Sequence, residues 1–489
     1  MSVRTRIAPS PTGEYHVGGL RTLLFDYALA KKNNGQLIIR IEDTDQGRLV
    51  PGAVERLLDV IEEYGISWDE GPRVGGPHAP YVQSERLDLY KKYAKELVEK
   101  GQAYYCFCTE ERLNKLREEQ RSKGMPTTKY DKHCFGLSKE EISQNLSQNK
   151  SYVIRLNVPK DRIIEVDDLV LGKLTFPSND LDDQILLKSD GFPTYQLAVV
   201  VDDHLMEITH VIRGFEWLPS TPKHVLLYEA FGWKIPNHAH VPLLKEAGST
   251  KKLSKRMGSV AAADFLKEGY LPEAVLNFLM FLGWNPGTEK EIYNLKEFVD
   301  DFSIDRIQKT DLVTFDRQKL LWYNGYYIRA YSAEDLTTKI IDYHKKYYPD
   351  ALFINWTDPL YTQQVVRLLQ ERLKLLSEFQ LLSSYFYSKP EIDKKLLIEF
   401  SGSVERSSEI LNSFLTCYDG IEKSGWELPA IDNLSHELIK EKGFKPKEAF
   451  MTLRVALTGQ TTTPPVFDIA ALLGKDIVID RIKDSLNEL

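Results

Sequence analysis

A loop close to the amino terminus constrains the fold more than any other segment of this chain. It spans residues 9–19 and reads PSPTGEYHVGG. An apolar, β-prone stretch over residues 3–8 precedes it, and a helix-like stretch over residues 20–32 follows it. A strand, a glycine-bearing turn and a helix start bring backbone N–H groups to a place where they can hold a phosphate. The sequence contains neither G-x-x-x-x-G-K-[S/T] nor G-x-G-x-x-G, so the two common nucleotide-binding loops are excluded.

Charged residues add chemistry to this loop. His16 lies inside the turn, where its imidazole either hydrogen-bonds phosphate oxygens or caps the turn. A second loop, residues 248–258, carries Lys252 and Lys255. A flexible pair of ammonium groups can follow the charge of a triphosphate into a transition state. The simpler alternative is a solvated basic loop.

The order of elements predicts an α/β protein with a doubly wound, Rossmann-like parallel sheet. Strands are expected at 3–8, 36–41, 198–201, 208–212 and 240–244. Helices are expected between them at 20–32, 51–65, 85–100 and 223–232. Residues 104–190 break this alternation, with strands expected at 152–158, 162–166 and 184–188, and we interpret them as an insertion between two halves of the sheet.

Beyond residue 262 the β-prone runs become scarce, and helices are expected at 271–282, 335–346, 361–379, 393–400, 407–418 and 445–457. A chain of 489 residues is long for one domain. We therefore predict five segments: 1–103 and 191–262 form the catalytic domain, 104–190 the insertion, 263–330 a connecting region and 331–489 a helical domain.

Charge and hydropathy narrow the function classes. The net charge of −8 excludes a uniformly basic nucleic-acid coat, although a local basic patch can still bind RNA. The amino terminus has no apolar signal core before the loop, and the longest apolar stretch, residues 274–284, is too short for a bilayer. We expect a cytoplasmic protein without a membrane partner.

Two motifs resemble the signatures of class I aminoacyl-tRNA synthetases. His16-Val17-Gly18-Gly19 resembles the first signature and Lys252-Leu253-Ser254-Lys255-Arg256 the second. Gly19 replaces the final histidine of the first signature, a departure shared by the glutamyl branch. The run from Arg6 to Gly13, RIAPSPTG, is similar to the bacterial type of the glutamyl-tRNA synthetase family.

The resemblance implies an activity, substrates and a set of domains. It implies that ATP with Mg²⁺ activates L-glutamate to glutamyl-adenylate, and that the glutamyl group passes to the 3′-terminal adenosine of tRNA-Glu with release of pyrophosphate and AMP. The insertion would bind the acceptor stem, the region 263–330 would contact the tRNA stem, and the carboxyl-terminal helices would bind the anticodon. His16, Lys252 and Lys255 would act in catalysis, and a monomer is expected. The implied ATP site comprises His16, Gly18, Gly19, Lys252, Leu253, Ser254 and Lys255.

The same resemblance implies a glutamate pocket. Glu42, in the run R-I-E-D-T-D, matches the glutamate that contacts the substrate amino group. Arg6 and Arg213 are the candidates for the two substrate carboxylates, since a guanidinium can bind a carboxylate through two hydrogen bonds. The remaining implied pocket residues are Ala8, Ser10 and Tyr195. Val199 stands where some relatives have an asparagine, so that contact is expected to be absent or replaced.

Three of the four cysteines cluster in the predicted insertion. Cys106 and Cys108 form C-x-C, and Tyr130 and Cys134 form Y-x-x-x-C, which resembles a zinc site of some family members. Three thiolates and a phenolate can surround a tetrahedral zinc ion, with His133 as the competing fourth ligand. The alternative is reduced thiols without metal. Any zinc bound here would be structural.

Arg372 aligns with an arginine that some relatives use to read the anticodon, although an exposed helix arginine explains it nearly as well. Three rivals share parts of these motifs. Nucleotidylyltransferases are much shorter chains, and a queuosine-modifying relative ends near the lysine-rich loop. An inactive RNA-binding paralogue would not need His16, Glu42 and Lys255 to be intact.

Overall fold

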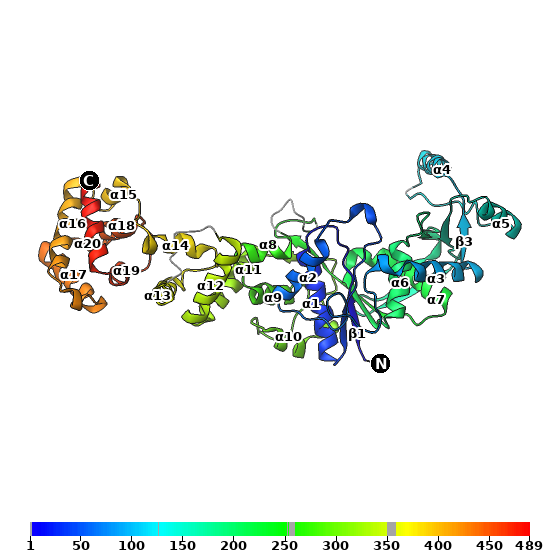
Figure 1. The fold of residues 1–489 in the computed structure, drawn as a ribbon, viewed down its shortest axis with the longest axis horizontal. Coiled ribbons are helices and arrows are strands. Elements are labelled where there is room, and N and C mark those ends of the chain that lie inside the picture. The colour runs from blue at the N-terminus through cyan, green and yellow to red at the C-terminus, as the bar shows by residue number, and fades with distance from the viewer. Residues whose placement is uncertain (1, 126, 252, 254–259, 350–357) are drawn as a thin grey trace. The chain divides into compact units, whose positions relative to one another are not determined.

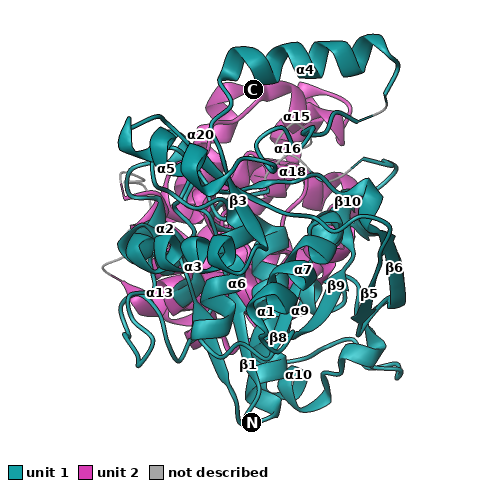
Figure 2. Cartoon of the chain, turned by 90° about the vertical axis from the view of Figure 1, so that its right-hand side faces the viewer, with its two compact units in different colours: residues 1–265, 275–317 teal, residues 266–274, 318–489 magenta. Residues whose placement is uncertain are grey.

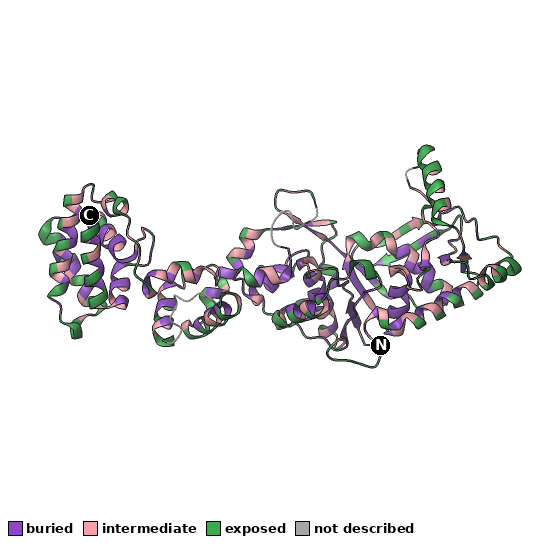
Figure 3. Cartoon of the chain, turned by 45° about the horizontal axis from the view of Figure 1, so that its top comes forward, coloured by how far each residue is buried: buried purple, intermediate pink, exposed green. Residues whose placement is uncertain are grey.

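The computed structural model describes residues 2–125, 127–251, 253, 260–349 and 358–489 (Figure 1). The chain divides into two compact units, which Figure 2 distinguishes by colour. Unit 1 comprises residues 1–265 and 275–317, and unit 2 comprises residues 266–274 and 318–489. In both units the buried positions lie along the inner faces of helices and strands (Figure 3). The finer division into five segments stays a prediction.

A twisted parallel sheet forms the centre of unit 1. Strand β1 (Arg4–Ile7) pairs in parallel with β2 (Gln36–Ile39), and β8 (His210–Gly214) pairs in parallel with β9 (Asn237–Val241). The N–H of Gln36 donates to the carbonyl of Val3, whereas the N–H of Thr209 donates to the carbonyl of Arg4. Carbonyls of successive strand residues point to opposite edges, so β8 lies beside β1 on the edge away from β2. The predicted doubly wound arrangement is confirmed.

Helices pack around this sheet. Helix α1 contacts β1, β2 and β8, and α6 packs against both α3 and α7. Their inner faces share one core with the inserted segment, because Leu97, Ile154 and Leu227 belong to the same buried cluster. The bounds of the helices in this part are α1 (Val17–Lys32), α2 (Ala53–Glu63), α3 (Leu87–Glu99), α6 (Tyr195–Leu205) and α7 (Thr221–Phe231).

The strand predicted at 198–201 is wrong, because these residues lie inside α6. This β-branched run is buried on every side of the helix, and burial of its side chains outweighs the intrinsic preference of valine for strands. The next turn of the same helix carries two buried acidic residues. Asp202 and Asp203 both turn inward there, and Asp202 accepts hydrogen bonds from Gln83, Arg86 and Tyr90 at 2.8–2.9 Å.

The predicted insertion contains its own antiparallel sheet. Strand β4 lies between β3 and β7, and β5 and β6 form a hairpin. Asp168 at the end of β5 pairs with His238 of β9, which joins the hairpin to the parallel sheet. Residues 110–122, which follow β3, form a helix whose residues all remain at least partly exposed. The bounds are β3 (Ala103–Cys106), α4 (Glu110–Ser122), α5 (Lys139–Ser147), β4 (Val153–Leu156), β5 (Ile163–Asp168), β6 (Gly172–Pro177) and β7 (Ile185–Leu187).

The rest of the chain is mostly helical, as expected. Strands β10 (Leu243–Glu246) and β11 (Leu312–Phe315) pair in parallel. The helices are α8 (Ala262–Lys267), α9 (Pro272–Met280), α10 (Leu295–Asp301), α11 (Arg317–Ala330), α12 (Ala333–Tyr347), α13 (Pro359–Leu369), α14 (Glu378–Tyr387), α15 (Lys394–Glu399), α16 (Val404–Asp419), α17 (Leu428–Lys442), α18 (Pro446–Thr458), α19 (Val466–Leu473) and α20 (Lys475–Glu488).

The single helix predicted over 361–379 is wrong, because a turn separates α13 from α14. The side chain of Glu378 accepts hydrogen bonds from the backbone N–H groups of Lys374 and Leu375 at 2.7 and 3.1 Å. These bonds satisfy backbone donors of the turn that precedes Ser377, the N-cap of α14. Within the described residues, the structure has no helix with the length and apolar character needed to cross a membrane.

Candidate active site

A cavity of about 910 Å³ opens at the carboxyl ends of β1 and β8. The helix that starts beside it is α1, and the strand order reverses at β1, which is where open parallel sheets bind ligands. Most of the residues expected in the ATP and glutamate sites line this one cavity: Arg6, Ala8, Ser10, His16, Gly18, Gly19, Glu42, Tyr195, Arg213 and Leu253. Folding therefore brings together residues that are more than 200 positions apart.

His16 caps helix α1 and also lines the cavity. Its Nδ1 accepts a hydrogen bond from the N–H of Gly18 at 2.9 Å, which places the ring proton on Nε2. The two sequence interpretations, a turn cap and a phosphate contact, are thus compatible. The cap orients the ring at the positive end of the helix dipole.

Gly19 has a steric explanation. A Cβ at this position would lie 2.8 Å from the ring of Tyr15, and that ring is buried. A side chain such as histidine could not be placed there without moving Tyr15. The departure from the first signature is therefore built into the local packing.

The lysine-rich loop is tied to this site by its described residues. Leu253 is buried, lines the cavity and donates its N–H to the carbonyl of Leu244 at 2.7 Å. After the loop, Val260 accepts from the N–H of Val17, and Ala262 donates to Tyr15. The expected catalytic and ATP-binding residues Lys252, Ser254 and Lys255 lie outside the described residues.

Buried ion pairs hold Arg6 and Glu42 in the cavity wall. The Nε of Arg6 contacts Asp203 at 3.2 Å, and Arg40 contacts Asp203 at 2.8 Å and Glu42 at 3.4 Å. Burial is the largest influence and opposes the charge on Arg6, but Asp203, Tyr195 and Asp26 act against it, and the pKa of Arg6 is raised. Among the described residues, the two Nη atoms of Arg6 have no hydrogen-bond partner, so its fork can receive a carboxylate.

Glu42 differs from an ordinary carboxyl group. Burial raises its pKa to about 7, although Arg40 and Arg6 act in the opposite direction. A cation placed next to Glu42 would favour its ionised form. The position therefore suits an ammonium group that enters the cavity.

Arg213 lies on the other wall, beside Tyr195. Its Nη1 donates to the Tyr195 hydroxyl at 3.2 Å and its Nη2 to Thr221 at 2.7 Å. Tyr195 in turn packs on Trp217, with ring centroids 4.7 Å apart. Arg213 and Tyr195 together present hydrogen-bond donors to the cavity, which suits an anionic ligand group.

Comparisons with known proteins show the family. Residues 2–322 match the model described as the catalytic domain of class I tRNA synthetases (E and Q), and residues 336–486 match an anticodon-binding domain. The chain belongs to the class I tRNA synthetases.

Full-length relatives agree with this family. The chain is 44% identical to a glutamate–tRNA ligase of Clostridium tetani, with coverage of 100% of this chain and 98% of the relative. A glutamate–tRNA ligase of Alkaliphilus metalliredigens is 42% identical, over 99% of this chain and 98% of the relative. The crystal structure of a glutamate tRNA ligase from Elizabethkingia meningosepticum, in complex with its amino acid, matches with a TM-score of 0.91 at 35% identity and covers 100% of both chains. The expected resemblance and fold class are confirmed.

The synthetase has cavity residues that the sequence did not single out. Lys188, Thr44 and Trp217 line the cavity, and the Lys188 ammonium donates to the Thr44 carbonyl at 3.2 Å. Thr44 belongs to the R-I-E-D-T-D run, so its neighbourhood was visible, whereas nothing in the sequence marks Lys188 or Trp217. Val199 is buried inside α6 and is absent from the described residues that line the cavity, so its own side chain is not part of the cavity wall.

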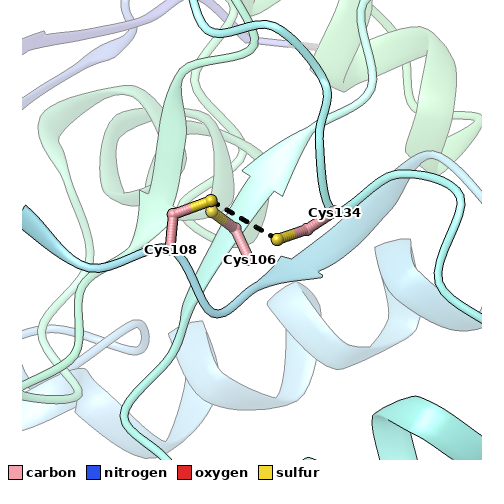
Figure 4. A group of neighbouring side chains, drawn as sticks. All are labelled: Cys106, Cys108 and Cys134. Carbon is pink, nitrogen blue, oxygen red and sulfur yellow. Dashed lines mark hydrogen bonds between the residues drawn. The ribbon is translucent and has the colours of Figure 1, made fainter. Parts of the chain in front are cut away.

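The cysteine cluster of the synthetase is compact. The ligand atoms of Cys106, Cys108 and Cys134 lie within 4.8 Å of one another (Figure 4), and the Sγ atoms of Cys108 and Cys134 are 3.5 Å apart. The Tyr130 hydroxyl lies 3.3 Å from Cys106 and 3.2 Å from Cys108. His133 is exposed and is not part of this group. The geometry therefore favours Tyr130 over His133 as a fourth ligand.

Arg372 of the synthetase is exposed in the turn between α13 and α14, rather than inside a helix. Its own N–H donates to the Leu369 carbonyl at 2.8 Å. Burial and the neighbouring charge of Arg372 lower the pKa of Arg454, which places two guanidinium groups near each other in unit 2. Arg454 is partly buried, whereas Arg372 is exposed and presents a cation that suits a nucleic-acid ligand.

Proposed function

We propose that this chain is a glutamate–tRNA ligase. It activates L-glutamate with MgATP to glutamyl-adenylate, releases pyrophosphate, and transfers the glutamyl group to the 3′-terminal adenosine of tRNA-Glu with release of AMP. The observation that carries the proposal is the single cavity in which Glu42, Arg6, Arg213 and the start of α1 meet. The names of the full-length relatives support the same activity.

Each group in the cavity has a task in this reaction. The ionised carboxylate of Glu42 holds the amino group of the substrate, and Arg6 and Arg213 hold its two carboxylates. The first turn of α1 and His16 bind the phosphates of ATP, whose displacement at the α-phosphate needs charge stabilisation more than covalent catalysis. Positioning lowers the barrier further, because both reactants are held in one site.

The wider assignments are also proposals. Mg²⁺ would accompany ATP, the insertion would bind the acceptor stem, residues 263–330 would contact the tRNA stem, and residues 331–489 would bind the anticodon through Arg372. We infer that the protein is cytoplasmic and that it is a monomer. Sedimentation at several concentrations tests the monomeric state. Lys252, Ser254 and Lys255 would complete the ATP site.

Substitution of Arg6 tests the function. Arg6→Ala should abolish most glutamate-dependent charging of tRNA-Glu. The loss should be smaller with glutamine, because the side-chain NH₂ of glutamine already meets the N–H groups of Arg6 donor to donor in the wild type. Buried polar contacts of this kind favour the matched over the mismatched amino acid by factors of about 10⁴–10⁵ in kcat/KM. Arg56→Ala, in an exposed ion pair with Glu14, is the matched control. A wild-type chain that consumes no ATP with glutamate and tRNA would refute the ligase. Equal loss of both amino acids would instead assign Arg6 to the α-carboxylate.

We also propose one structural zinc ion held by Cys106, Cys108, Cys134 and Tyr130. Their spacing fits four ligands around one tetrahedral ion. The neighbouring Cys134 and Tyr130 groups lower the pKa of the Cys106 thiol, which is the direction that favours a thiolate ligand. Such an ion would stabilise the inserted sheet and supply no chemistry to the reaction.

Metal analysis decides this proposal. Elemental analysis of the wild-type chain should find about one zinc per chain, as a closed structural site requires. Cys106→Ser should lose the metal, whereas Cys417→Ser, on α16 in unit 2, should keep it. Metal-free wild-type protein that still charges tRNA would leave the three cysteines as reduced thiols.

A further inference from the structure

Arg213 is held from behind by groups that do not line the cavity. Its Nε donates to Nε2 of His240 at 3.0 Å, and its Nη1 lies 3.3 Å from Nδ1 of His224. Thr221 accepts from Nη2 and also lies 3.2 Å from Nε2 of His240. Both histidines are buried, at 0% exposure for His240 and 3% for His224. The direction of the guanidinium is therefore set by hydrogen bonds inside the core.

The chemistry of arginine fixes the tautomer of His240. A guanidinium donates and never accepts, so Nε2 of His240 must be the acceptor and the ring proton must sit on Nδ1. That proton points at Oδ2 of Asp168, 2.6 Å away. Asp168, His240 and Arg213 thus form one chain of donors and acceptors with a single allowed direction.

Asp168 is itself held in a defined orientation. Its Oδ1 accepts from the N–H groups of Val170 and Leu171 at 3.0 and 2.9 Å, and its Oδ2 accepts from the backbone N–H of His240 at 3.1 Å. The backbone N–H of His240 also lies 3.4 Å from Oδ1, so the two oxygens share this donor, whereas only Oδ2 faces the imidazole. Burial opposes the charge of Asp168, but the hydrogen bonds from His240 and Leu171 lower its pKa.

We propose that Asp168 and His240 are positioning residues, which orient the Arg213 guanidinium for a carboxylate of the amino-acid substrate. The inference rests on the proposed function, since it needs Arg213 to bind that carboxylate. Neither residue touches the cavity, and both act through Arg213. Asp168 comes from the predicted insertion and His240 from β9, so the insertion contributes to amino-acid selection as well as to its expected tRNA contact.

The electrostatics of the buried cluster agree with a neutral ring. Burial lowers the pKa of His240, and Arg213 adds to this, against the opposing influence of Asp168. Burial and Arg213 likewise lower the pKa of His224. Nε2 of His224 lies 2.6 Å from the amide oxygen of Gln196. In a neutral ring Nε2 can donate to this oxygen only when Nδ1 carries no proton, so Nδ1 is the acceptor for Arg213.

Asp168→Asn is the sharpest variant because it changes one atom. In this variant the N–H groups of Val170 and Leu171 still donate to an oxygen, which is now the amide oxygen of the asparagine. The amide NH₂ must therefore take the place of Oδ2 and face Nδ1 of His240. The ring proton then moves to Nε2 and meets the Nε–H of Arg213 donor to donor. Replacement of such a carboxylate by an amide places imidazole in the wrong tautomer in other sites.

The kinetic expectation separates positioning from general damage. In charging assays, Asp168→Asn should raise KM for glutamate by about tenfold or more, the loss expected when a buried donor loses its acceptor. KM for ATP should stay within about twofold, because the phosphate-binding part of the cavity is unchanged. Asp167→Asn, the exposed neighbour on β5, is the matched control and should behave as wild type.

A second variant protects the test from misfolding. Glutamine has an amide oxygen near the position of Nε2 and has no tautomers. His240→Gln should therefore be milder than Asp168→Asn, and Asp168→Asn added to it should change KM for glutamate by less than Asp168→Asn alone. An equal rise in KM for ATP, or strictly additive effects, would overturn the inference.

A direct measurement does not depend on activity. Histidine labelled with ¹⁵N, in a chain with ten histidines, should show His240 protonated on Nδ1 in the wild type and on Nε2 in Asp168→Asn. An Nε2 proton in the wild type would refute the relay even if the ligase is correct. A wild-type chain with the expected tautomer but without glutamate charging would refute the function instead.

Discussion

Single residues in the cavity owe their character to their partners rather than to their type. Arg6 and Arg213 are both buried, yet Asp203 holds Arg6 through Nε alone, while neutral groups surround Arg213. The two arginines therefore differ in how many N–H groups they keep for a substrate. Glu42 follows the same principle, because burial outweighs two nearby cations and keeps its pKa near neutrality.

Glu42 leads to a pH prediction. Its pKa of about 7 means that the empty site takes up a proton as the pH falls through neutrality, and the carboxyl then loses its attraction for an ammonium group. We expect kcat/KM for glutamate to fall about tenfold per pH unit below that value. Glu42→Gln should be weakly active and should lose this limb of the profile.

The profile is measured by charging of tRNA-Glu between pH 5.5 and 8.5, a range of about three units around the pKa. Glu55→Gln, exposed in the first turn of α2, should keep the wild-type profile. An unchanged acidic limb in Glu42→Gln would assign the ionisation to another group.

At the scale of elements, helix α6 connects segments of unit 1 that lie far apart in the sequence. Asp202 contacts Arg86 at 2.8 Å and Arg40 at 3.6 Å, and Asp203 contacts Arg6 and Arg40. These ion pairs connect α6 to β1, to the segment after β2 and to the start of α3. The helix is therefore a structural connector, since its carboxylates neutralise Arg6 in the cavity wall and the buried Arg40 and Arg86.

Removal of Asp202 should destabilise unit 1. Asp202→Ala leaves Arg86 and Arg40 buried without part of their counter-charge, and the loss of one partner from a buried pair costs about 3–5 kcal/mol. Urea unfolding followed by circular dichroism should show an earlier first transition. Asp88→Ala, which removes an exposed carboxylate from α3, should leave the midpoint unchanged. Equal midpoints for both variants would show that the buried pairs contribute no net stability.

At the scale of the whole molecule, the residues proposed for the two tasks lie in different units. All the described residues of the cavity belong to unit 1, and Arg372 belongs to unit 2. The family models divide the chain in a similar way, into a catalytic domain and an anticodon-binding domain. Substitutions in one unit should therefore affect one substrate class.

Arg372→Ala tests this separation. We expect KM for tRNA-Glu to rise by about tenfold, since loss of one base contact or stack costs about 1–3 kcal/mol. KM for glutamate should be unchanged. Arg367→Ala, also exposed and on α13, is the control that removes an equal charge. A similar rise for both arginines would indicate a general electrostatic contribution instead of base recognition.

Local patterns in the sequence were sufficient for the parts of this protein that depend on neighbouring residues. The turn before α1, the alternation of strands and helices, and the two signature motifs are local, because turns and helix starts are set by nearby residues. From these patterns the α/β class could be predicted, and the resemblance of the motifs to a known family supplied the set of candidate cavity residues. The resemblance of the C-x-C and Y-x-x-x-C motifs to a known zinc site also predicted that the three cysteines and Tyr130 lie together.

Tertiary structure decided what depends on burial and on distant partners. Residues 198–201 carry a strand-like composition, but a helix buries them and turns Asp202 and Asp203 toward arginines from other segments. No sequence pattern connects Asp168 to His240, since they are more than 70 residues apart and meet only where β5 joins β9. The direction of a hydrogen bond is fixed by which donors and acceptors are enclosed together, and only the folded chain determines that enclosure.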